Sequence, residues 1–282
     1  PGKFRREALR AIGSMMKRSG DDGLRRLAGL AHRLRPELTV EPVPGTGMFL
    51  VRDGDLSATV ARRTRLHTQI TGIAQRRRWL AQDYMIDDRL VSPGDLVIDC
   101  GANIGEVAMI CAGLGARVIA FEPDPTEFEA LSANAAATGG ISAHRLALWN
   151  ETGTLDFYPG NDTGDSSLIA SGTAGEPIRV ETRRLDDLGA VIGTDEPIRL
   201  LKLEAEGAEP EILDGAMATL DRVDFVSVDM GPERGLTQDN TVPQVVNRLC
   251  AAGFRLRTFR QNRCIGLFVS ARLSEEATDG PA

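Results

Sequence analysis

The chain has 282 residues, of which 42% are hydrophobic and 26% charged, so it is long enough to bury a full core and its composition does not indicate disorder. The net charge of −7 is unevenly divided: residues 1–90 carry 18 basic against 10 acidic side chains, and the other 192 residues carry 15 against 30. Two segments of opposite charge indicate two different roles.

Basic clusters occur at residues 62–65 and 76–78, with only Trp79 and Tyr84 as aromatic neighbours. A nucleic-acid surface usually carries more readout residues beside its cations, so no nucleic-acid partner is expected. We expect these charges to be solvated or internally paired, with an anionic substrate group or a membrane surface as the alternative. No apolar run approaches the roughly 18 residues of a membrane span. The four cysteines lack metal or redox spacing, which favours a reduced, cytoplasmic protein.

Residues 1–90 predict an appended helical and β-hairpin module. Its expected elements are a helix over 4–18, a helix capped by Asp21 and Asp22 and closed by Pro36, a hairpin of residues 48–52 and 56–61, and a helix near 67–82. The amphipathic pattern of residues 1–38 fits either a homodimer surface or peripheral contact with a membrane, and periodicity does not separate the two.

From residue 95 onward apolar strands alternate with helices. The expected order is strand 96–100, helix 104–113, strand 117–121, a helix with a capping box of Asp124 and Glu127, strand 143–148, strands 154–158 and 178–184 in a polar insertion, strand 198–204, helix 208–219, strand 223–229, a helix capped by Asn240 or Thr241, and strands 254–259 and 264–270. Repeated β-then-α steps predict a parallel sheet covered on both faces. The last strand is expected to be antiparallel, because no helix precedes it. The main domain should span 91–272, with 273–282 a disordered tail.

The most informative motif joins two strand ends. Residues 99–106 read Asp-Cys-Gly-Ala-Asn-Ile-Gly-Glu, and Glu122 ends the next strand. Nucleoside cofactors bind at such adjacent carboxyl ends of parallel strands. A dinucleotide-binding loop has glycine where this chain has Asn103 and Glu106, and a carboxylate at the helix start repels a pyrophosphate. S-adenosylmethionine has no phosphate and a cationic head, and therefore fits better, with Glu122 accepting hydrogen bonds from both ribose hydroxyls.

Three blocks of the chain resemble the FkbM family of S-adenosylmethionine-dependent methyltransferases, over about residues 90–230. They are residues 99–106, Phe121-Glu122-Pro123, and Lys-Leu-Glu-Ala-Glu-Gly-Ala-Glu at 202–209. The resemblance implies an α/β class I methyltransferase fold, which is Rossmann-like and doubly wound around a mostly parallel seven-stranded sheet. It also implies O-methylation, often of sugar hydroxyls on glycans, glycolipids or secondary metabolites. The residues expected to bind the cofactor on this basis are Asp99, Gly101, Asn103, Gly105, Glu106, Glu122 and Pro123.

A sugar hydroxyl has to lose its proton on methylation, so a base within hydrogen-bond reach is expected. His144 is expected at the start of a strand, far from the site, in a structural role. This leaves Glu204, Glu206 and Glu209, whose mutual repulsion should raise one pKa, with Lys202 tempering that repulsion. The alternative is that Glu209 caps a helix and Glu204 orders the loop.

The chain departs from the family pattern at two carboxylates, one in the third block and one after the following strand. Glu204 stands where the family usually has Asp, and Asp229 where it often has Glu, which puts any transfer of a catalytic role to Glu204 in question. Glu204, Glu206 and Asp229 together have the chemistry to hold a hard cation, but the resemblance does not imply a metal, and none is expected.

Neighbouring segments supply further candidates. Ala147 and Leu148 are expected near the adenine, and the segment Asp165-Ser166-Ser167 is expected to fold over the cofactor. Glu233 and Arg234 are expected either to contact the acceptor or to form a plain turn. Tyr84 is expected either to close the pocket or to pack as an ordinary aromatic residue. We therefore expect an O-methyltransferase acting on a glycan or a related small molecule. The alternatives are a natural-product or nitrogen acceptor, and a cofactor-binding pseudoenzyme that recruits a partner.

Overall fold

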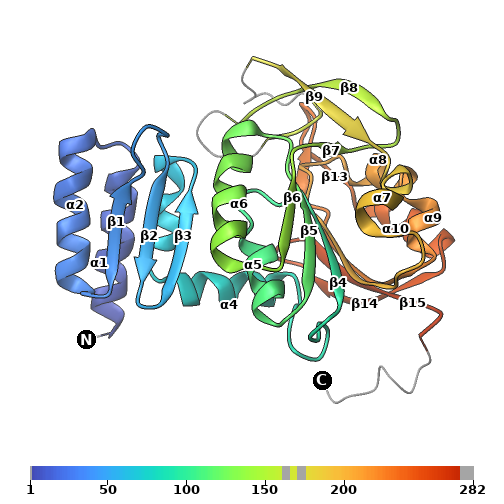
Figure 1. The fold of residues 1–282 in the computed structure, drawn as a ribbon, viewed down its shortest axis with the longest axis horizontal. Coiled ribbons are helices and arrows are strands. Elements are labelled where there is room, and N and C mark those ends of the chain that lie inside the picture. The colour runs from blue at the N-terminus through green and yellow to red at the C-terminus, as the bar shows by residue number, and fades with distance from the viewer. Residues whose placement is uncertain (1, 161–165, 170–175, 274–282) are drawn as a thin grey trace.

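A seven-stranded sheet in the order β14-β15-β11-β10-β4-β5-β6 forms the centre of the molecule in the computed structural model, which describes residues 2–160, 166–169 and 176–273 (Figure 1). Its strands are β4 (Leu96–Cys100), β5 (Arg117–Phe121), β6 (Ile141–His144), β10 (Ile198–Leu203), β11 (Val223–Asp229), β14 (Phe254–Arg260) and β15 (Ile265–Ser270). β15 is antiparallel to β11 and β14, and the other pairs are parallel. The predicted fold class, including the antiparallel last strand, is confirmed.

Both faces of this sheet are apolar, and each packs against its own set of helices. On one face Ile98 and Leu203 belong to a core with residues of α7 (Gly189–Ile192), α8 (Glu209–Asp214), α9 (Met217–Leu220) and α10 (Val242–Ala251). On the other face Val97 and Leu200 belong to a core with residues of α4 (Ile73–Asp83), α5 (Glu106–Gly113) and α6 (Pro125–Thr138). Alternate residues of a strand point to opposite faces, so the near-continuous apolar strands follow from this two-sided burial.

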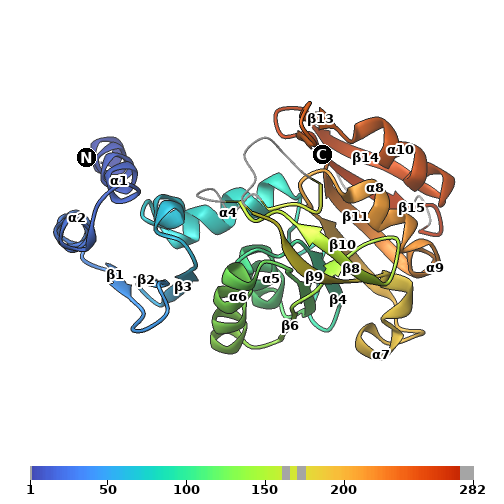
Figure 2. The same ribbon diagram turned by 90° about the horizontal axis from the view of Figure 1, so that it is seen from above.

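The N-terminal residues form a module that packs beside α6. It contains α1 (Gly2–Met16), α2 (Asp21–Leu34), an antiparallel sheet of β1 (Leu38–Pro42), β2 (Phe49–Asp53) and β3 (Leu56–Val60), a 3-10 turn η1 (Arg63–Arg65), and α3 (Leu66–Gln69). Figures 1 and 2 show this module on one side of α6, with α4 leading from it to the main sheet. Its core includes Ile104 and Ala130 of the main domain. The predicted helices and hairpin are present, whereas β1 was not predicted.

Three expected elements are interrupted. The strand expected over 143–148 is divided: β6 ends at His144, and β7 (Ala147–Leu148) pairs with β9 (Ile178–Arg183), which also pairs with β8 (Gly153–Phe157) in a second sheet. His144 therefore lies at the carboxyl end of its strand, and the expectation that it begins one was wrong. The helix expected near 67–82 breaks into α3 and α4 at Gly72, which has a φ of 125°. The helix expected over 208–219 divides into α8 and α9.

Helix caps also differ from the expectation. α2 has Gly20 as its N-cap and no side-chain capping bond, so Asp21 and Asp22 do not cap it. Asp124 does cap α6, but the carboxylate of Glu127 pairs with Arg62 instead of completing a capping box. The remaining elements are η2 (Leu185–Asp187), β12 (Pro232–Arg234) and β13 (Asp239–Asn240).

Two further expectations, for the C-terminal tail and for Asp165, concern residues at or beyond the edges of the described segments. Leu273 packs against the core, while residues 274–282 of the expected tail and Asp165 of the polar insertion lie outside the described residues. Within the part of the chain that the structure describes, no helix is long and apolar enough to cross a membrane.

Candidate active site

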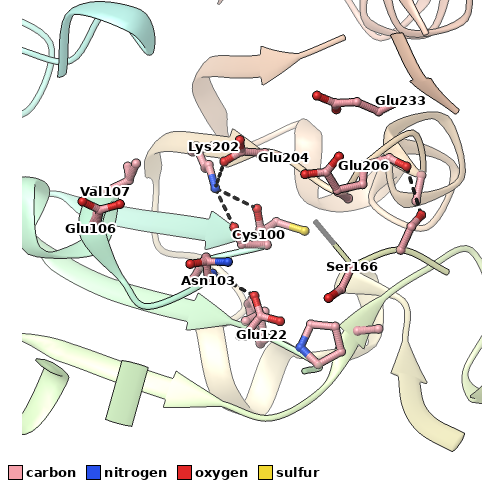
Figure 3. Close-up of a pocket in the computed structure, with 18 of the residues that line it drawn as sticks. Cys100, Asn103, Glu106, Val107, Glu122, Ser166, Lys202, Glu204, Glu206 and Glu233 are labelled. Atoms are coloured by element: carbon pink, nitrogen blue, oxygen red, sulfur yellow. Dashed lines mark hydrogen bonds and ion pairs between the residues drawn. The ribbon is translucent and has the colours of Figure 1, made fainter. Parts of the chain in front are cut away.

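A cavity of about 490 Å³ opens at the carboxyl ends of β4, β5 and β10 (Figure 3). The predicted site residues that line it are Gly101, Asn103, Glu106, Glu122, Pro123, Ala147, Leu148, Ser166, Lys202, Glu204, Glu206 and Glu233. The predicted residues that do not line it are Tyr84, Asp99, Gly105, Glu209, Asp229 and Arg234. Most of the predicted site residues therefore line one cavity, and the second group lies outside its lining.

The glycine loop brings the end of β4 against the end of β10. Gly101 has a φ of 67°, and a Cβ at this position would lie 1.7 Å from the carbonyl oxygen of Glu204. The N–H groups of Gly101 and Ala102 both donate to the carbonyl oxygen of Phe121 at 3.0 Å. No side chain fits at Gly101, so the loop presents bare backbone to the cavity.

Glu122 follows β5 and is 6% exposed. Its Oε2 accepts the N–H of Asn103 at 2.7 Å, and its Oε1 accepts the N–H of Asp124 at 2.8 Å. Burial raises the pKa of Glu122 to about 8, although these two N–H groups favour the ionised form. A carboxylate has about four acceptor positions, so Glu122 retains capacity to accept hydroxyl groups of a ligand in the cavity.

Lys202 lies at the junction of β10 and β4 and is only 1% exposed. Its Nζ is 3.0 Å from Asp99 and 3.2 Å from Glu204, and it donates to the carbonyl oxygen of Gly101 at 2.7 Å. Burial opposes its charge, but Asp99 and then Glu204 raise the pKa of Lys202 above its ordinary value. In Glu204 burial favours the neutral form, but Lys202 outweighs it and lowers the pKa of Glu204.

Two further predicted residues, Tyr84 and Asp229, are buried near Lys202 and Glu204. Tyr84 is 1% exposed, and its ring lies 5.5 Å from Lys202 Nζ; it is a packed aromatic residue rather than a lid. Asp229 accepts the N–H of Gly231 at 3.0 Å and lies 3.4 Å from Arg263. Burial, and then the charge of Glu204, raise the pKa of Asp229 to about 6. Arg263 itself lines the cavity, and nothing in the sequence reasoning had identified it.

Glu209 and Arg234 hold the turn that presents Glu206. The buried carboxylate of Glu209 accepts the N–H groups of Ala205 at 2.9 Å and Gly207 at 3.2 Å, which satisfies backbone donors of the turn. Arg234 donates to the carbonyl oxygen of Gly207, and a Cβ on Gly207 would lie 2.6 Å from the Cα of Arg234. Glu206 has a φ of 51°, a conformation rare for a residue with a side chain. Glu209 thus has a structural role in the turn, but the alternative that it caps the helix was wrong, because α8 has Ala208 as its N-cap and no side-chain capping bond.

Glu206 and Glu233 face the same part of the cavity from different elements (Figure 3). Burial, and then repulsion from Asp229 and Glu204, raise the pKa of Glu233 to about 8, while a hydrogen bond with Glu206 opposes the rise. We had expected mutual repulsion to raise a pKa within the set of Glu204, Glu206 and Glu209. Within that set Lys202 lowers the pKa of Glu204, and burial rather than repulsion raises the pKa of Glu209, which lies outside the cavity. Beside Glu206, the cavity carboxyl with a raised pKa is that of Glu233.

The segment at residues 166–169 crosses the cavity. Ser166 Oγ donates to Asp124 at 3.1 Å, and Ser167 Oγ donates to the carbonyl oxygen of Glu206 at 2.9 Å. These two bonds connect Asp124, the cap of α6, with the turn that carries Glu206. Ser166 and Ser167 line the cavity, and the expectation that their segment folds over a cofactor stays a prediction.

The N-terminal module and α4 form one wall of the cavity, which was not predicted from the sequence. The wall consists of Arg65, His67, Thr68, Arg76, Leu80 and Asp83. Glu106 lies against it: Gln69 Nε2 donates to Glu106 at 2.7 Å, and Arg76 forms an ion pair with it at 2.8 Å. The expected internal pairing of the arginine clusters is thus seen at Arg76 and at Arg62, which pairs with Asp124 and Glu127. The clusters themselves were the available signal that this module reaches the site.

Two of the three carboxylates considered as metal ligands, Glu204 and Asp229, form ion pairs instead. Glu204 pairs with Lys202 and Asp229 with Arg263. Among residues 2–160, 166–169 and 176–273, no three His, Cys, Asp or Glu side chains are placed to hold a metal ion together.

The chain is similar in sequence to known methyltransferases. The profile of the family described as Methyltransferase FkbM domain matches residues 99–256. The 2-O-methyltransferase NoeI of Sinorhizobium fredii is 28% identical over 59% of this chain and 76% of that protein. The hexuronic acid methyltransferase AglP of Haloferax volcanii is 33% identical over 48% of this chain and 56% of that protein. Among solved structures, magnesium protoporphyrin IX methyltransferase from Synechocystis PCC 6803 aligns with a TM-score of 0.41 and 14% identity over 72% of this chain and 83% of that one.

Proposed function

Because the chain belongs to the FkbM family of methyltransferases and is an S-adenosylmethionine-dependent enzyme, we propose that it transfers a methyl group to a hydroxyl of a sugar, glycan or related metabolite. The observation that carries this proposal is the layout of the cavity, with Glu122 at one side and the carboxyl pair of Glu206 and Glu233 at the other. NoeI and AglP, which are named for 2-O-methylation and for a hexuronic acid, support a sugar as the acceptor.

The residues of the cavity fit S-adenosylmethionine. A carboxylate at Glu122 suits the ribose hydroxyls, and the buried Ala147 and Leu148 provide apolar walls for an adenine ring. A Cβ at Gly101 would collide with the carbonyl oxygen of Glu204, so glycine at this position lets the ends of β4 and β10 come together beside the cavity. Carboxylates around the cavity favour a cationic cofactor. The bound cofactor would supply an electrophilic methyl group, and its sulfonium would leave as a neutral thioether.

The acceptor hydroxyl needs a proton acceptor, and Glu233 with Glu206 fits this role better than Glu204. The pKa of Glu204 is lowered, so its carboxylate is a weak base. The pKa of Glu233 is raised and lies near the physiological pH range. The acceptor oxygen would form the new bond to the methyl carbon while its proton moves to the carboxylate pair. Lys202 and Glu204 would hold the ends of β4 and β10 in position and set the local charge.

The proposal predicts that Glu233→Gln and Glu206→Gln each lower turnover by roughly 10²–10⁴ while affinity for S-adenosylhomocysteine stays nearly unchanged. Calorimetry with S-adenosylhomocysteine, with NAD as the control ligand, measures the affinity, and methyl transfer to a panel of glycans measures turnover. Glu196→Gln on the surface is the matched control and should behave as wild type.

Each outcome tests a different part of the proposal. Binding of S-adenosylhomocysteine that is lost in Glu122→Ala supports the cofactor site, and binding of NAD instead would contradict it. Full turnover in both glutamine variants would remove the carboxyl pair from the mechanism. Cofactor binding without transfer to any hydroxyl acceptor would favour a pseudoenzyme or a different acceptor class.

A further inference from the structure

A second hollow, of about 390 Å³, adjoins the cavity on its N-terminal side. We call it the basic hollow, and its lining residues are Arg10, Ser14, Lys17, His67, Thr68, Thr71, Arg76 and Trp79. His67, Thr68 and Arg76 line the cavity as well, so the two spaces share a wall. The basic hollow belongs to none of the elements that carry the family motif, because its residues lie in the N-terminal module and on α4.

The basic hollow is positively charged. Arg10, Lys17 and Arg76 line it, and no acidic side chain does. Arg10, Ser14 and Lys17 follow one another at helical spacing and so face the same side of α1 and its end. Neither Arg10 nor Lys17 forms an ion pair with another described residue, unlike Arg76, which pairs with Glu106. After burial, the charges of Lys17, Arg65 and Arg76 lower the pKa of His67, which shows that these cations converge on one region.

The two spaces therefore differ in their charged side chains. Acidic residues, among them Glu204 and Glu206, line the cavity together with cations such as Lys202 and Arg263, whereas the adjoining hollow is lined by cations and by no acidic residue. A ligand with a neutral hydroxyl at one end and an anionic group at the other would be oriented by this field: the anion is repelled from the carboxylates and attracted to the hollow. Trp79 is 38% exposed on the same wall, and its indole offers an apolar face against which a sugar ring can pack.

We propose that the basic hollow binds an acidic group, a phosphate or a carboxylate, carried by the acceptor saccharide. The inference rests on the proposed function, because it names the class of acceptor that the methyl-transfer site receives. Arg10 and Lys17 attract the acidic group, and Trp79 packs against the adjoining sugar ring. The hydroxyl to be methylated then lies in the cavity beside Glu206 and Glu233.

The test is equilibrium binding of three probes to the full chain saturated with S-adenosylhomocysteine. The probes are glucuronate, glucose 1-phosphate and glucose, which distinguish a carboxylate, a phosphate and a neutral sugar. We expect at least one acidic probe to bind about tenfold or more tightly than glucose, which corresponds to about 1.4 kcal/mol. This preference should weaken as salt is raised, because exposed charges are screened.

Two variants locate the binding. The double variant Arg10→Glu with Lys17→Glu should remove the preference for the acidic probe, and Trp79→Ala should weaken binding of both kinds of sugar. Arg5→Glu makes the same type of charge change on α1 at a residue that does not line the hollow, and it should leave binding as in wild type. Circular dichroism of each variant confirms that the fold is retained.

Other outcomes overturn the inference. Equal affinity for glucose and both acidic probes would exclude an acidic subsite. Loss of S-adenosylhomocysteine affinity in the double variant would assign the hollow to the carboxylate of the cofactor. Sedimentation with phosphatidylglycerol vesicles, without binding of either acidic sugar, would assign it to a membrane surface. Failure of the proposed function is distinguishable, because it appears as absent cofactor binding or absent methyl transfer rather than as an altered preference between sugars.

Discussion

At the scale of single residues, the end of β10 is organised around one buried cation. Lys202 Nζ contacts the carboxylates of Asp99 and Glu204 and the carbonyl oxygen of Gly101, so it joins two strands and the glycine loop. Register places Lys202 directly opposite Asp99 in the parallel pairing of β10 with β4. Because Lys202 lowers the pKa of Glu204, it also decides which carboxyl of the cavity remains available as a base.

Lys202→Met should therefore destabilise the protein by about 3–5 kcal/mol, because it leaves Asp99 buried without its counter-charge. Urea unfolding followed by circular dichroism measures this change. The double variant Asp99→Asn with Lys202→Met removes the uncompensated charge and should recover part of the loss. If the double variant is as unstable as the sum of the two single variants, the two residues are not coupled.

The raised pKa of Glu233 gives a signed pH dependence. Its carboxyl is protonated near neutrality and becomes a proton acceptor only as pH rises through about 8, so kcat/KM should increase over that range. Glu233→Gln should abolish this increase. Stability should change in the opposite direction: protonated Glu233 stabilises the folded state at low pH, and this contribution is lost as pH rises from the ordinary value of 4.5 to about 8. Glu233→Gln should thus gain stability relative to wild type as pH rises, and a constant difference would contradict the assignment.

At the scale of elements, one asparagine closes the edge of the small N-terminal sheet. Asn134 of α6 accepts the N–H of Thr59 at 2.6 Å, and its amide donates to the carbonyl oxygens of Thr59 at 2.9 Å and Ile104 at 2.8 Å. The side chain thereby pairs with the outer strand β3 as a neighbouring strand would, which satisfies an exposed backbone edge. The same residue contacts the loop before α5, so it connects the module to the cofactor loop.

Asn134→Ala should lower the free energy of unfolding by roughly 1–3 kcal/mol, because buried backbone groups lose their partners. Hydrogen exchange should show faster exchange at the Thr59 amide and in β3, with the central strands protected as before. Asn247→Ala, on the exposed side of α10, provides a control that changes the same residue type in a helix. Equal effects of the two substitutions would show that the seam does not depend on Asn134.

The elements also show how far the sequence determines the fold. β4, β5 and β11 have the predicted bounds, because each is a continuous apolar run between turn residues. The break after His144 was not predictable in the same way. Local composition continues the apolar pattern, and β7 is defined by its pairing with β9, more than thirty residues along the chain. Pairing of Arg76 with Glu106 likewise depends on the approach of α4 to α5, which no local spacing reports.

The residues of the candidate site divide in the same way, into those that the local sequence predicts and those placed by long-range packing. The glycine loop, Glu122 and the 202–209 block were located because their roles follow from strand ends and backbone geometry. Arg263 and the N-terminal wall were missed, because their positions depend on long-range packing. Glu209 was expected either as a base or as a helix cap, and Arg234 either at the acceptor or in a plain turn. Their contacts hold the turn that presents Glu206.

At the scale of the whole molecule, the basic module and the acidic main domain are complementary. Arg62 follows β3 in the module and pairs with Asp124 at 2.9 Å and Glu127 at 2.7 Å, both at the start of α6. Asp124 in turn caps α6, donates its N–H to Glu122 and accepts the hydroxyl of Ser166. The opposite charges of the two segments thus meet beside the cofactor side of the cavity.

Arg62→Met should accordingly destabilise the protein by about 3–5 kcal/mol, because Asp124 and Glu127 are almost fully buried and lose their counter-charge. Arg52→Met breaks a pair with Glu41 in which the side chains are 50% and 60% exposed, and it should cost at most about 1 kcal/mol. Chemical unfolding compares the two variants, and hydrogen exchange locates the change, which we expect at β3, α3 and the start of α6. Affinity for S-adenosylhomocysteine should fall in Arg62→Met alone, because the backbone that positions Glu122 loses its anchor. Equal stability of the two variants would show that the module is held to the main domain by apolar packing through Ile104 and Ala130, with no contribution from this charged contact.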